Sequence, residues 1–298
     1  SPLYGRRTGE WMLKALGFKE LKKFYPKASF EELLKIYAIV GGIPAYAVKF
    51  GGKSIFENVE EKILAKGEYL YSEPEIMLRE ELREPSTYLS ILEAMGRNAK
   101  LTDIANQAKI PAKDAPKYLN KLENLELITR LNPVTEKNSK KTLYEIKDNF
   151  FRFWFKYVYP NKSELESQRS KNVLEKIRAD FNNYLGKIFE QVCAEYAEQN
   201  PSFSFTKIGK WWDKNIEIDL VALNENTGEI FFAECKWSEN VDGEKLLNAL
   251  KEKAAHVKWR NEERKEHYAL FAKSFKQATL KNALLVDAKK IEKELLQK

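Results

Sequence analysis

The sequence predicts a mixed α+β protein with several domains, because three kinds of pattern follow one another along the chain. Residues 1–78 are expected to form an all-α segment. Residues 79–160 combine three predicted helices with two short predicted strands. Residues 161–298 form an α/β unit in the order helix, three strands, helix, strand. With 298 residues the chain is long enough for two or three domains, each with its own core.

The middle segment resembles a winged helix-turn-helix, a module of three helices and a β-hairpin. The helices are expected over 86–95, 101–108 and about 113–124, and the strands over 127–131 and 142–146. Gly96 is a natural stop for the first helix, and Thr102 is a plausible cap for the second. Such a module places its third helix in the major groove of DNA and its hairpin loop, the wing, against the phosphate backbone.

Two groups of lysines are the candidate DNA contacts of this module. One group recurs at four-residue steps along the third helix, and the other lies in the wing. They are Lys113, Lys117 and Lys121 on the helix, and Lys137, Lys140 and Lys141 in the wing. Winged helices also serve as joints between proteins, and any surface helix carries lysines, so that alternative stays open.

The last segment begins with an amphipathic helix whose apolar residues recur at three- and four-residue steps between Ile177 and Tyr196. A strand is expected over 202–208, and a hairpin over 216–237 with its turn at 224–228. A helix over 243–258, a strand over 266–272 and a last apolar run, 283–287, complete the segment.

The second strand of that hairpin carries charged residues on an otherwise apolar face. Its period-two alternation puts Glu234 and Lys236 on one face and Cys235 on the other. An acid and an amine in such a place need a partner, and Asp219 on the first strand is the candidate. Two converging carboxylates attract a hard cation such as Mg²⁺, and a nearby lysine can act on the attacking water.

Asp219 followed by Glu234-Cys235-Lys236 resembles the PD-(D/E)xK signature of restriction-endonuclease-like and archaeal resolvase-like nucleases, with Ile218 in the place of the proline. The resemblance implies an αβββαβ core. It also implies that Asp219 and Glu234 hold Mg²⁺ or Mn²⁺ and that Lys236 is the water-orienting base. The stretch 186–190 resembles a GxxFE turn of the resolvase-like members, which adds Glu190 to the catalytic acids.

Two alternatives remain open at this site. The helical wheel places Glu190 opposite the centre of the apolar stripe, where a merely solvated residue would also lie. The charged residues of the hairpin could equally form a surface ion pair at a strand edge.

The beginning of the chain resembles the C-terminal part of the helical lid of archaeal AAA+-type ATPases, over 1–8 and 37–46. In that family the lid is followed by a winged helix and a nuclease-like domain, and this chain has the same order. It is therefore expected to be a C-terminal fragment or a degenerate relative. The stretch 51–54 is the nearest match to a phosphate loop, but Ala47 replaces the required earlier glycine. ATP is expected as a cofactor only if a missing N-terminal ATPase domain is present.

Composition sets outer limits on function. There are 51 Lys and Arg against 44 Asp and Glu, and the net charge of +7 mildly favours an anionic partner such as DNA. No apolar run approaches the ~20 residues that span a bilayer, and no signal peptide is visible. Two cysteines far apart in the sequence, Cys193 and Cys235, allow neither a disulfide framework nor a zinc site, which predicts a cytoplasmic protein. Abundant Lys and Glu are typical of thermophiles.

The aromatic run 150–157 is expected to be a buried seam between the middle and last segments, with a linker over 161–170. Trp211 and Trp212 are expected to pack at the start of a strand.

Taken together, these patterns predict a DNA-binding protein with a Mg²⁺-dependent endonuclease-like domain. The alternative is a catalytically inactive DNA- or protein-binding module that regulates the missing ATPase. A homodimer is left open, because nucleases of this class often pair.

Overall fold

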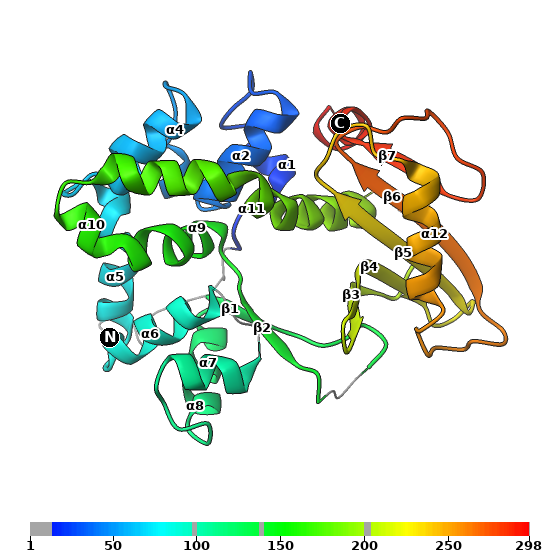
Figure 1. The fold of residues 1–298 in the computed structure, drawn as a ribbon, viewed down its shortest axis with the longest axis horizontal. Coiled ribbons are helices and arrows are strands. Elements are labelled where there is room, and N and C mark those ends of the chain that lie inside the picture. The colour runs from blue at the N-terminus through cyan, green and yellow to red at the C-terminus, as the bar shows by residue number, and fades with distance from the viewer. Residues whose placement is uncertain (1–13, 97–99, 137–139, 200–203, 298) are drawn as a thin grey trace, which may run out of the picture.

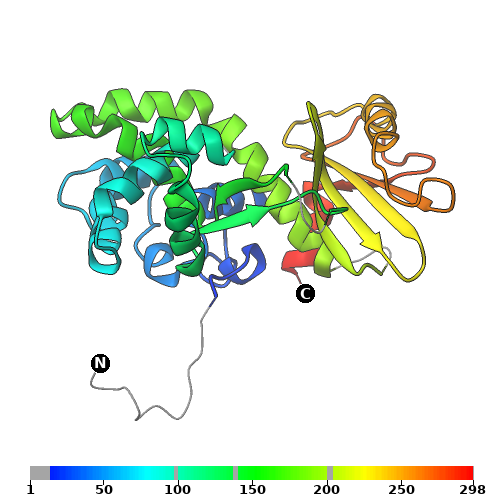
Figure 2. The same ribbon diagram turned by 90° about the horizontal axis from the view of Figure 1, so that it is seen from below.

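The computed structural model describes residues 14–96, 100–136, 140–199 and 204–297. Figure 1 shows a helical part and a part built on a β-sheet, joined by the long helix α11, and Figure 2 shows the same two parts side by side after a 90° turn. Lys137, which was predicted to contact DNA, and the stretch 1–8, which resembles an ATPase lid, lie outside the described residues. No helix among the described residues is long and apolar enough to cross a membrane.

Residues 14–81 are helical where the structure describes them, as the sequence predicts. The elements are α1 (Phe18–Leu21), α2 (Phe30–Val40), α3 (Pro44–Ala47), α4 (Ile55–Asn58), a π-helical turn (Val59–Leu64) and α5 (Tyr69–Glu81). Side-chain caps begin two of them, because Ser29 accepts from the Glu32 N–H and Ser54 forms a capping box with Glu57. The stretch that resembled a phosphate loop is therefore the bend that precedes a capped helix.

The middle segment contains the three helices and the hairpin that the sequence predicts. They are α6 (Pro85–Met95), α7 (Leu101–Gln107), α8 (Ala115–Asn124), β1 (Ile128–Leu131) and the antiparallel partner β2 (Leu143–Ile146). The predicted cap of the second helix is wrong, because Lys100 is the N-cap residue and Thr102 lies inside α7. Lys113 lies in the turn before α8.

The aromatic run forms a core, as predicted. It folds into α9 (Asn149–Phe153) and a π-helical turn (Trp154–Val158), in which Phe150, Phe153 and Trp154 have no exposed surface. The predicted linker is wrong, because its first half forms a 3₁₀ turn (Tyr159–Asn161) and α10 (Lys162–Glu166). The Lys162–Glu75 ion pair of 2.9 Å holds this segment against α5.

The predicted order of helix, three strands, helix and strand is confirmed in the last segment. It consists of α11 (Ser170–Gln199), β3 (Lys207–Asp213), β4 (Ile216–Asn224), β5 (Glu229–Lys236), α12 (Gly243–Ala254), β6 (Lys265–Ala272), β7 (Leu284–Asp287) and α13 (Ala288–Ile291), followed by a π-helical turn (Glu292–Leu296). The strands form one sheet in the order β3-β4-β5-β6-β7, antiparallel from β3 to β5 and parallel from β5 to β7. The first strand begins later than predicted, so that Trp211 and Trp212 lie inside β3.

Each face of this sheet is covered by a helix, which places the charged residues of β5 between apolar layers. Ala233 and Cys235 belong to the core that contains α11, whereas Ile230 and Phe232 belong to the core that contains α12. This division follows the period-two alternation of a strand. Glu234 and Lys236 therefore lie on the α12 face.

Candidate functional site

The strands β4 and β5 separate at the end where the predicted site residues lie. Their pairing runs from Asn224 opposite Glu229 to Leu220 opposite Ala233. Beyond that pair, the Asp219 Oδ2 atom accepts a hydrogen bond of 2.8 Å from the backbone N–H of Cys235. A carboxylate thus takes the place of a backbone acceptor, and the two strands are no longer paired beyond this point. We call this open end of β4 and β5 the fork.

A β-bulge in β4 sets the position of Asp219. Gly209 of β3 pairs with Val221, and Trp211 pairs with Ile218, so that Lys210 alone faces Asp219 and Leu220. An extra residue in one strand bends it and turns a side chain out of the regular alternation. The bulge brings Lys210 next to the fork.

Glu234 is buried, with 3% of its surface exposed, and both of its carboxylate oxygens have hydrogen-bond partners. Its Oε1 atom accepts from Lys236 Nζ at 2.9 Å. Lys253 Nζ of α12 lies 2.8 Å from Oε1 and 2.9 Å from Oε2. A buried carboxylate needs such partners, because its ionised form is costly to desolvate.

Sequence reasoning missed Lys253. The signal that could have found it is its place on α12, one turn after Leu250 and next to Ala254, which both face the sheet. Lys253 borders the buried side of α12, the helix that covers the fork. The ammonium group of a lysine in such a place has to point toward an acid or toward water.

Glu190 points toward the fork from α11, where it forms an ion pair with Lys210. Lys210 also lies 3.7 Å from Glu217. Burial lowers the pKa of Lys210, but the charge of Glu190 and the hydrogen bond to it raise the pKa by more, so the amine stays charged. Glu190 is therefore held in an ion pair at the fork and is not merely a solvated surface residue.

We call these six residues the fork cluster: Glu190, Lys210, Asp219, Glu234, Lys236 and Lys253. Its three carboxylates face three ammonium groups. Burial, and then the charges of Glu190 and Glu234, raise the pKa of Asp219 well above its usual range. Burial lowers the pKa of Lys236, but its bond to Glu234 and the charges of the three carboxylates of the cluster together raise the pKa by more. Asp219 is thus the acid whose charge is least compensated.

The donor set fits a hard divalent cation in chemistry, although not as a preformed cage. Within the described ranges, no three His, Cys, Asp or Glu side chains are grouped so that they could hold a metal ion. The undercompensated carboxylate of Asp219 suits a cation, and carboxylate oxygens are the ligands that Mg²⁺ prefers. The lysines on Glu234 would have to yield part of its oxygen surface.

The predicted DNA-contact lysines have two different surroundings. Lys113, Lys117, Lys121 and Lys140 are exposed. Lys117 lies above the ring of Tyr118 at 5.4 Å. Lys141 is engaged within the protein, because its Nζ atom lies 2.8 Å from Glu136 and 3.1 Å from Asp213.

The predicted wing is bound to the edge strand of the sheet. The Val134 N–H donates to the Lys210 carbonyl oxygen at 2.9 Å, and Trp212 Nε1 donates to the Lys141 carbonyl oxygen at 3.0 Å. The hairpin therefore connects the middle segment to β3, as the reach of β1 and β2 toward β3 in Figure 1 shows.

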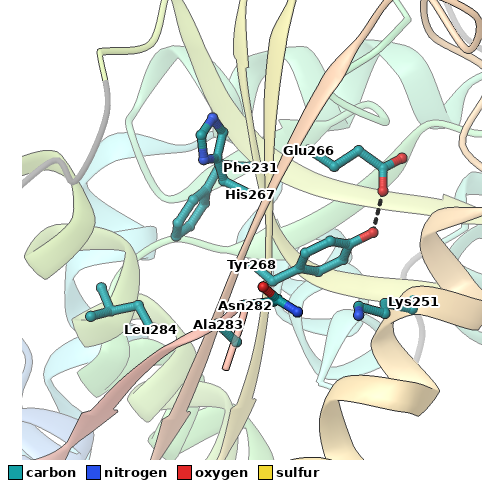
Figure 3. A pocket seen from close by; sticks show the side chains of 8 residues that line it. All are labelled: Phe231, Lys251, Glu266, His267, Tyr268, Asn282, Ala283 and Leu284. Atoms are coloured by element: carbon teal, nitrogen blue, oxygen red, sulfur yellow. Dashed lines mark hydrogen bonds between the residues drawn. The ribbon is translucent and has the colours of Figure 1, made fainter. Parts of the chain in front are cut away.

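A hollow of about 520 Å³ lies on the same sheet at the start of β6, where none of the fork cluster lines it. Figure 3 shows Phe231, His267 and Leu284 on one side of the strand and Tyr268 with Lys251 on the other. Tyr268 is hydrogen-bonded to Glu266. The hollow and the fork are separate features.

The two cysteines, distant in the sequence, meet beside the fork. Both are buried free thiols, and their side chains hydrogen-bond to each other across the contact between α11 and β5. Burial raises the pKa of both thiols, which makes them inert packing groups.

Fold and site together define a mixed α+β protein with a charged cluster at the open end of two central strands. Residues 154–257 match a family described as "Archaea bacterial proteins of unknown function", and this segment contains the whole fork cluster. The chain is also similar to the uncharacterized protein MJECL04 of Methanocaldococcus jannaschii, with 39% identity over 296 residues, 96% of this chain and 66% of that protein. The chain thus spans about two thirds of the length of that relative. No solved structure matches the chain.

Proposed function

We propose that the C-terminal sheet carries a divalent-metal-dependent nuclease site that hydrolyses phosphodiester bonds of DNA. The observation that supports this most directly is the fork itself. It gathers Asp219, Glu234 and Lys236, the residues of the nuclease-like signature, at the open end of two strands. Glu190 and Lys210 lie beside them.

In this proposal Asp219 and Glu234 would hold Mg²⁺ or Mn²⁺, with Glu190 as an outer acid. A divalent cation at such a site neutralises phosphate charge and makes a bound water more acidic. Lys236, whose side chain is 46% exposed, would orient the water and stabilise charge on the phosphate. The buried layers on both faces of the sheet would hold these groups in place.

The helices α6–α8 with the β1–β2 hairpin would bind duplex DNA as a winged helix. The exposed Lys113, Lys117, Lys121 and Lys140 support this role, whereas the ion pairs of Lys141 give that residue a part in holding the hairpin to β3. Binding through lysines should weaken with salt by about one counterion for each phosphate contacted.

Cleavage of labelled linear, single-stranded and branched DNA in Mg²⁺ or Mn²⁺ tests the nuclease site. Asp219→Ala and Lys236→Ala should each lower the cleavage rate by at least about a hundredfold while DNA binding is retained. Lys251→Ala, on the same helix as Lys253 but outside the fork, is the control and should cleave as the wild type does. Equal rates in all four proteins would refute the site.

Lys117→Ala combined with Lys121→Ala tests the DNA-binding role of α8. Duplex affinity should fall, and the slope of its logarithm against the logarithm of salt concentration should become shallower by about two. Lys281→Ala with Lys289→Ala, two exposed lysines of the sheet part, is the matched control. An unchanged slope in the α8 variant would remove this role.

A second candidate is a catalytically inactive module that binds DNA or a partner protein and regulates an ATPase domain elsewhere in a longer chain. The pairing within the fork cluster favours it, because Glu190 and Glu234 are already held in ion pairs with the three lysines of the cluster. The greater length of the archaeal relative leaves room for a further domain. Retained DNA binding with no cleavage in any divalent metal would support this candidate over the nuclease.

A further inference from the structure

The carboxylate of Glu234 is shared by two ammonium groups, and one of them spans both of its oxygens. Lys253 Nζ lies 2.8 Å from Oε1 and 2.9 Å from Oε2, and Lys236 Nζ lies 2.9 Å from Oε1. A divalent cation on Glu234 would be a third positive group at the same two atoms. Since like charges at this separation repel, at least one ammonium has to move when the cation binds.

Lys253 is the group whose bonds conflict most directly with such a cation. Every bond that the structure describes for its ammonium goes to Glu234. Its side chain is 32% exposed, so the ammonium can turn toward solvent while the helix keeps its stem at the fork. Lys236 lies at the end of β5, outside the bidentate contact, and can keep its place more easily.

We infer that Lys253 exchanges partners during binding: it neutralises Glu234 without the cation, and it binds a backbone phosphate of the nucleic acid once the cation has taken Glu234. This rests on the proposed metal site. A displaced ammonium beside a cation needs a new anion, and the non-bridging oxygens of a phosphodiester are the anion that the substrate brings. Lys253 is then a substrate-binding residue outside the sequence signature.

The exchange can be told apart from a purely structural role of the lysine. Removing the ammonium group should raise the affinity for the cation and lower the affinity for DNA in the presence of the cation. A cation that need not displace Lys253 should bind Glu234 more tightly. The DNA phosphate, in contrast, loses a contact, and loses it only when the cation is present. A lysine that only stabilises the fold would weaken both forms of binding together.

The experiment uses the full chain and Ca²⁺, a hard cation with oxygen ligands, titrated by calorimetry. Lys253→Met should bind Ca²⁺ about tenfold more tightly than the wild type, the scale of one charged hydrogen bond. Lys251→Met is the matched control on the same helix; its ammonium lies 5.6 Å above the Tyr268 ring and away from Glu234, and its Ca²⁺ affinity should not change.

Duplex affinity is then measured by fluorescence anisotropy with and without Ca²⁺, with gels to check that the DNA stays intact. In Ca²⁺, Lys253→Met should bind the duplex about tenfold more weakly than the wild type, with a salt slope shallower by about one. Without Ca²⁺ the two proteins should bind equally. Lys253→Arg should restore duplex affinity in Ca²⁺, because the charge is kept.

Two results would overturn the inference, and they differ. If Lys253→Met binds Ca²⁺ no better than Lys251→Met, or loses duplex affinity equally with and without Ca²⁺, the partner exchange is wrong while the metal site stands. If Ca²⁺ binds neither the wild type nor any variant, the proposed metal site fails and takes the inference with it. Thermal unfolding checks that the variants are folded, and Lys253→Gln, which keeps an N–H donor, supplies the same test should Lys253→Met not fold.

Discussion

Two carboxylates with buried oxygen atoms, those of Glu234 at the fork and Asp148 at the start of α9, are held by different kinds of partner. Glu234 has both oxygens bonded to lysine side chains that reach solvent. Asp148 caps α9, where its Oδ1 atom accepts from the backbone N–H of Phe151 at 2.9 Å. Its Oδ2 atom is buried without a hydrogen-bond partner in the described structure, packed against Gly41, where φ is +64° and a Cβ would approach to 2.9 Å.

The difference separates a site that can change its ligands from one that cannot. Lysine side chains can swing away, so the partners of Glu234 are replaceable by a metal ion. The backbone of α9 is part of the core, so the partner of Asp148 is permanent. Burial raises the pKa of Asp148 to about 6, because the ionised form has only the start of the helix and Arg152 to stabilise it. We therefore interpret Asp148 as structural.

The largest expected effect concerns the base of the fork. Trp237, directly after Lys236, lies 5.0 Å from the ring of Phe189 and 6.3 Å from that of Phe30. Trp237→Ala should lower the free energy of unfolding by about 3–5 kcal/mol, measured by urea denaturation. Trp259→Ala, at a half-buried position, should cost less. Equal losses would mean that the fork does not rest on a rigid core.

The second effect is a pH dependence that belongs to Asp148. Its pKa is about 6 when folded and 3.8 in the unfolded chain, so the folded protein binds a proton between these values that the unfolded chain does not. Stability from this group is therefore present below about pH 4 and lost as pH rises through 6, by about 3 kcal/mol in total.

Asp148→Asn keeps a capping oxygen and removes the charge, and urea midpoints of the two proteins between pH 4 and pH 7 isolate the effect. The other ionisable groups contribute the same pH dependence to the stability of both proteins, so their contribution cancels in the difference. The wild type should lose about 3 kcal/mol relative to the variant over this range. Parallel pH profiles would show that Asp148 is well solvated or paired, and would remove one side of the comparison.

A smaller effect is expected at the fork acid. Glu234→Gln removes the charge that both ammonium groups share, and it should cost about 2 kcal/mol of unfolding free energy, since both lysines can still turn to water. Glu239→Gln, whose partner is also a lysine but whose side chain is 61% exposed, should cost much less. If Glu234→Gln proved neutral, the lysines would not depend on Glu234 in the way that partner exchange requires.

The smallest effect is at the helix that carries Lys253. Asp242 caps α12 by accepting from the Lys245 N–H at 3.1 Å. Asp242→Ala should cost about 1 kcal/mol in thermal or urea unfolding, whereas Asp242→Asn should cost little, because Asn caps as well as Asp. A loss in the Asn variant as large as in the Ala variant would mean that charge, and not the cap bond, stabilises α12 here.

Much of the architecture could be predicted because it follows from local patterns. The hairpin from Ile216 to Lys236, the helix α11 and the three helices before β1 are encoded in periodicities of two and of 3.6 residues and in turn residues. Errors fell where tertiary contacts override local signals. The supposed linker folds as α10 because Lys162 and Glu166 find partners on other helices. The first strand of the sheet begins later than its apolar residues suggest, because β4 pairs with it only from Lys207 onward.

The sequence by itself determined most of the elements, and alternation put Glu234 and Lys236 on one face of a strand, while the resemblance to the nuclease signature pointed to Asp219. Only the tertiary structure decided which residues of other elements pair with them. The bulge opposite Lys210, the arrival of Lys253 from α12 and the binding of the wing to β3 all join residues from separate elements. Periodicity specifies which face a residue occupies, but charge pairing depends on which faces meet, and that is settled only when the helices pack on the sheet.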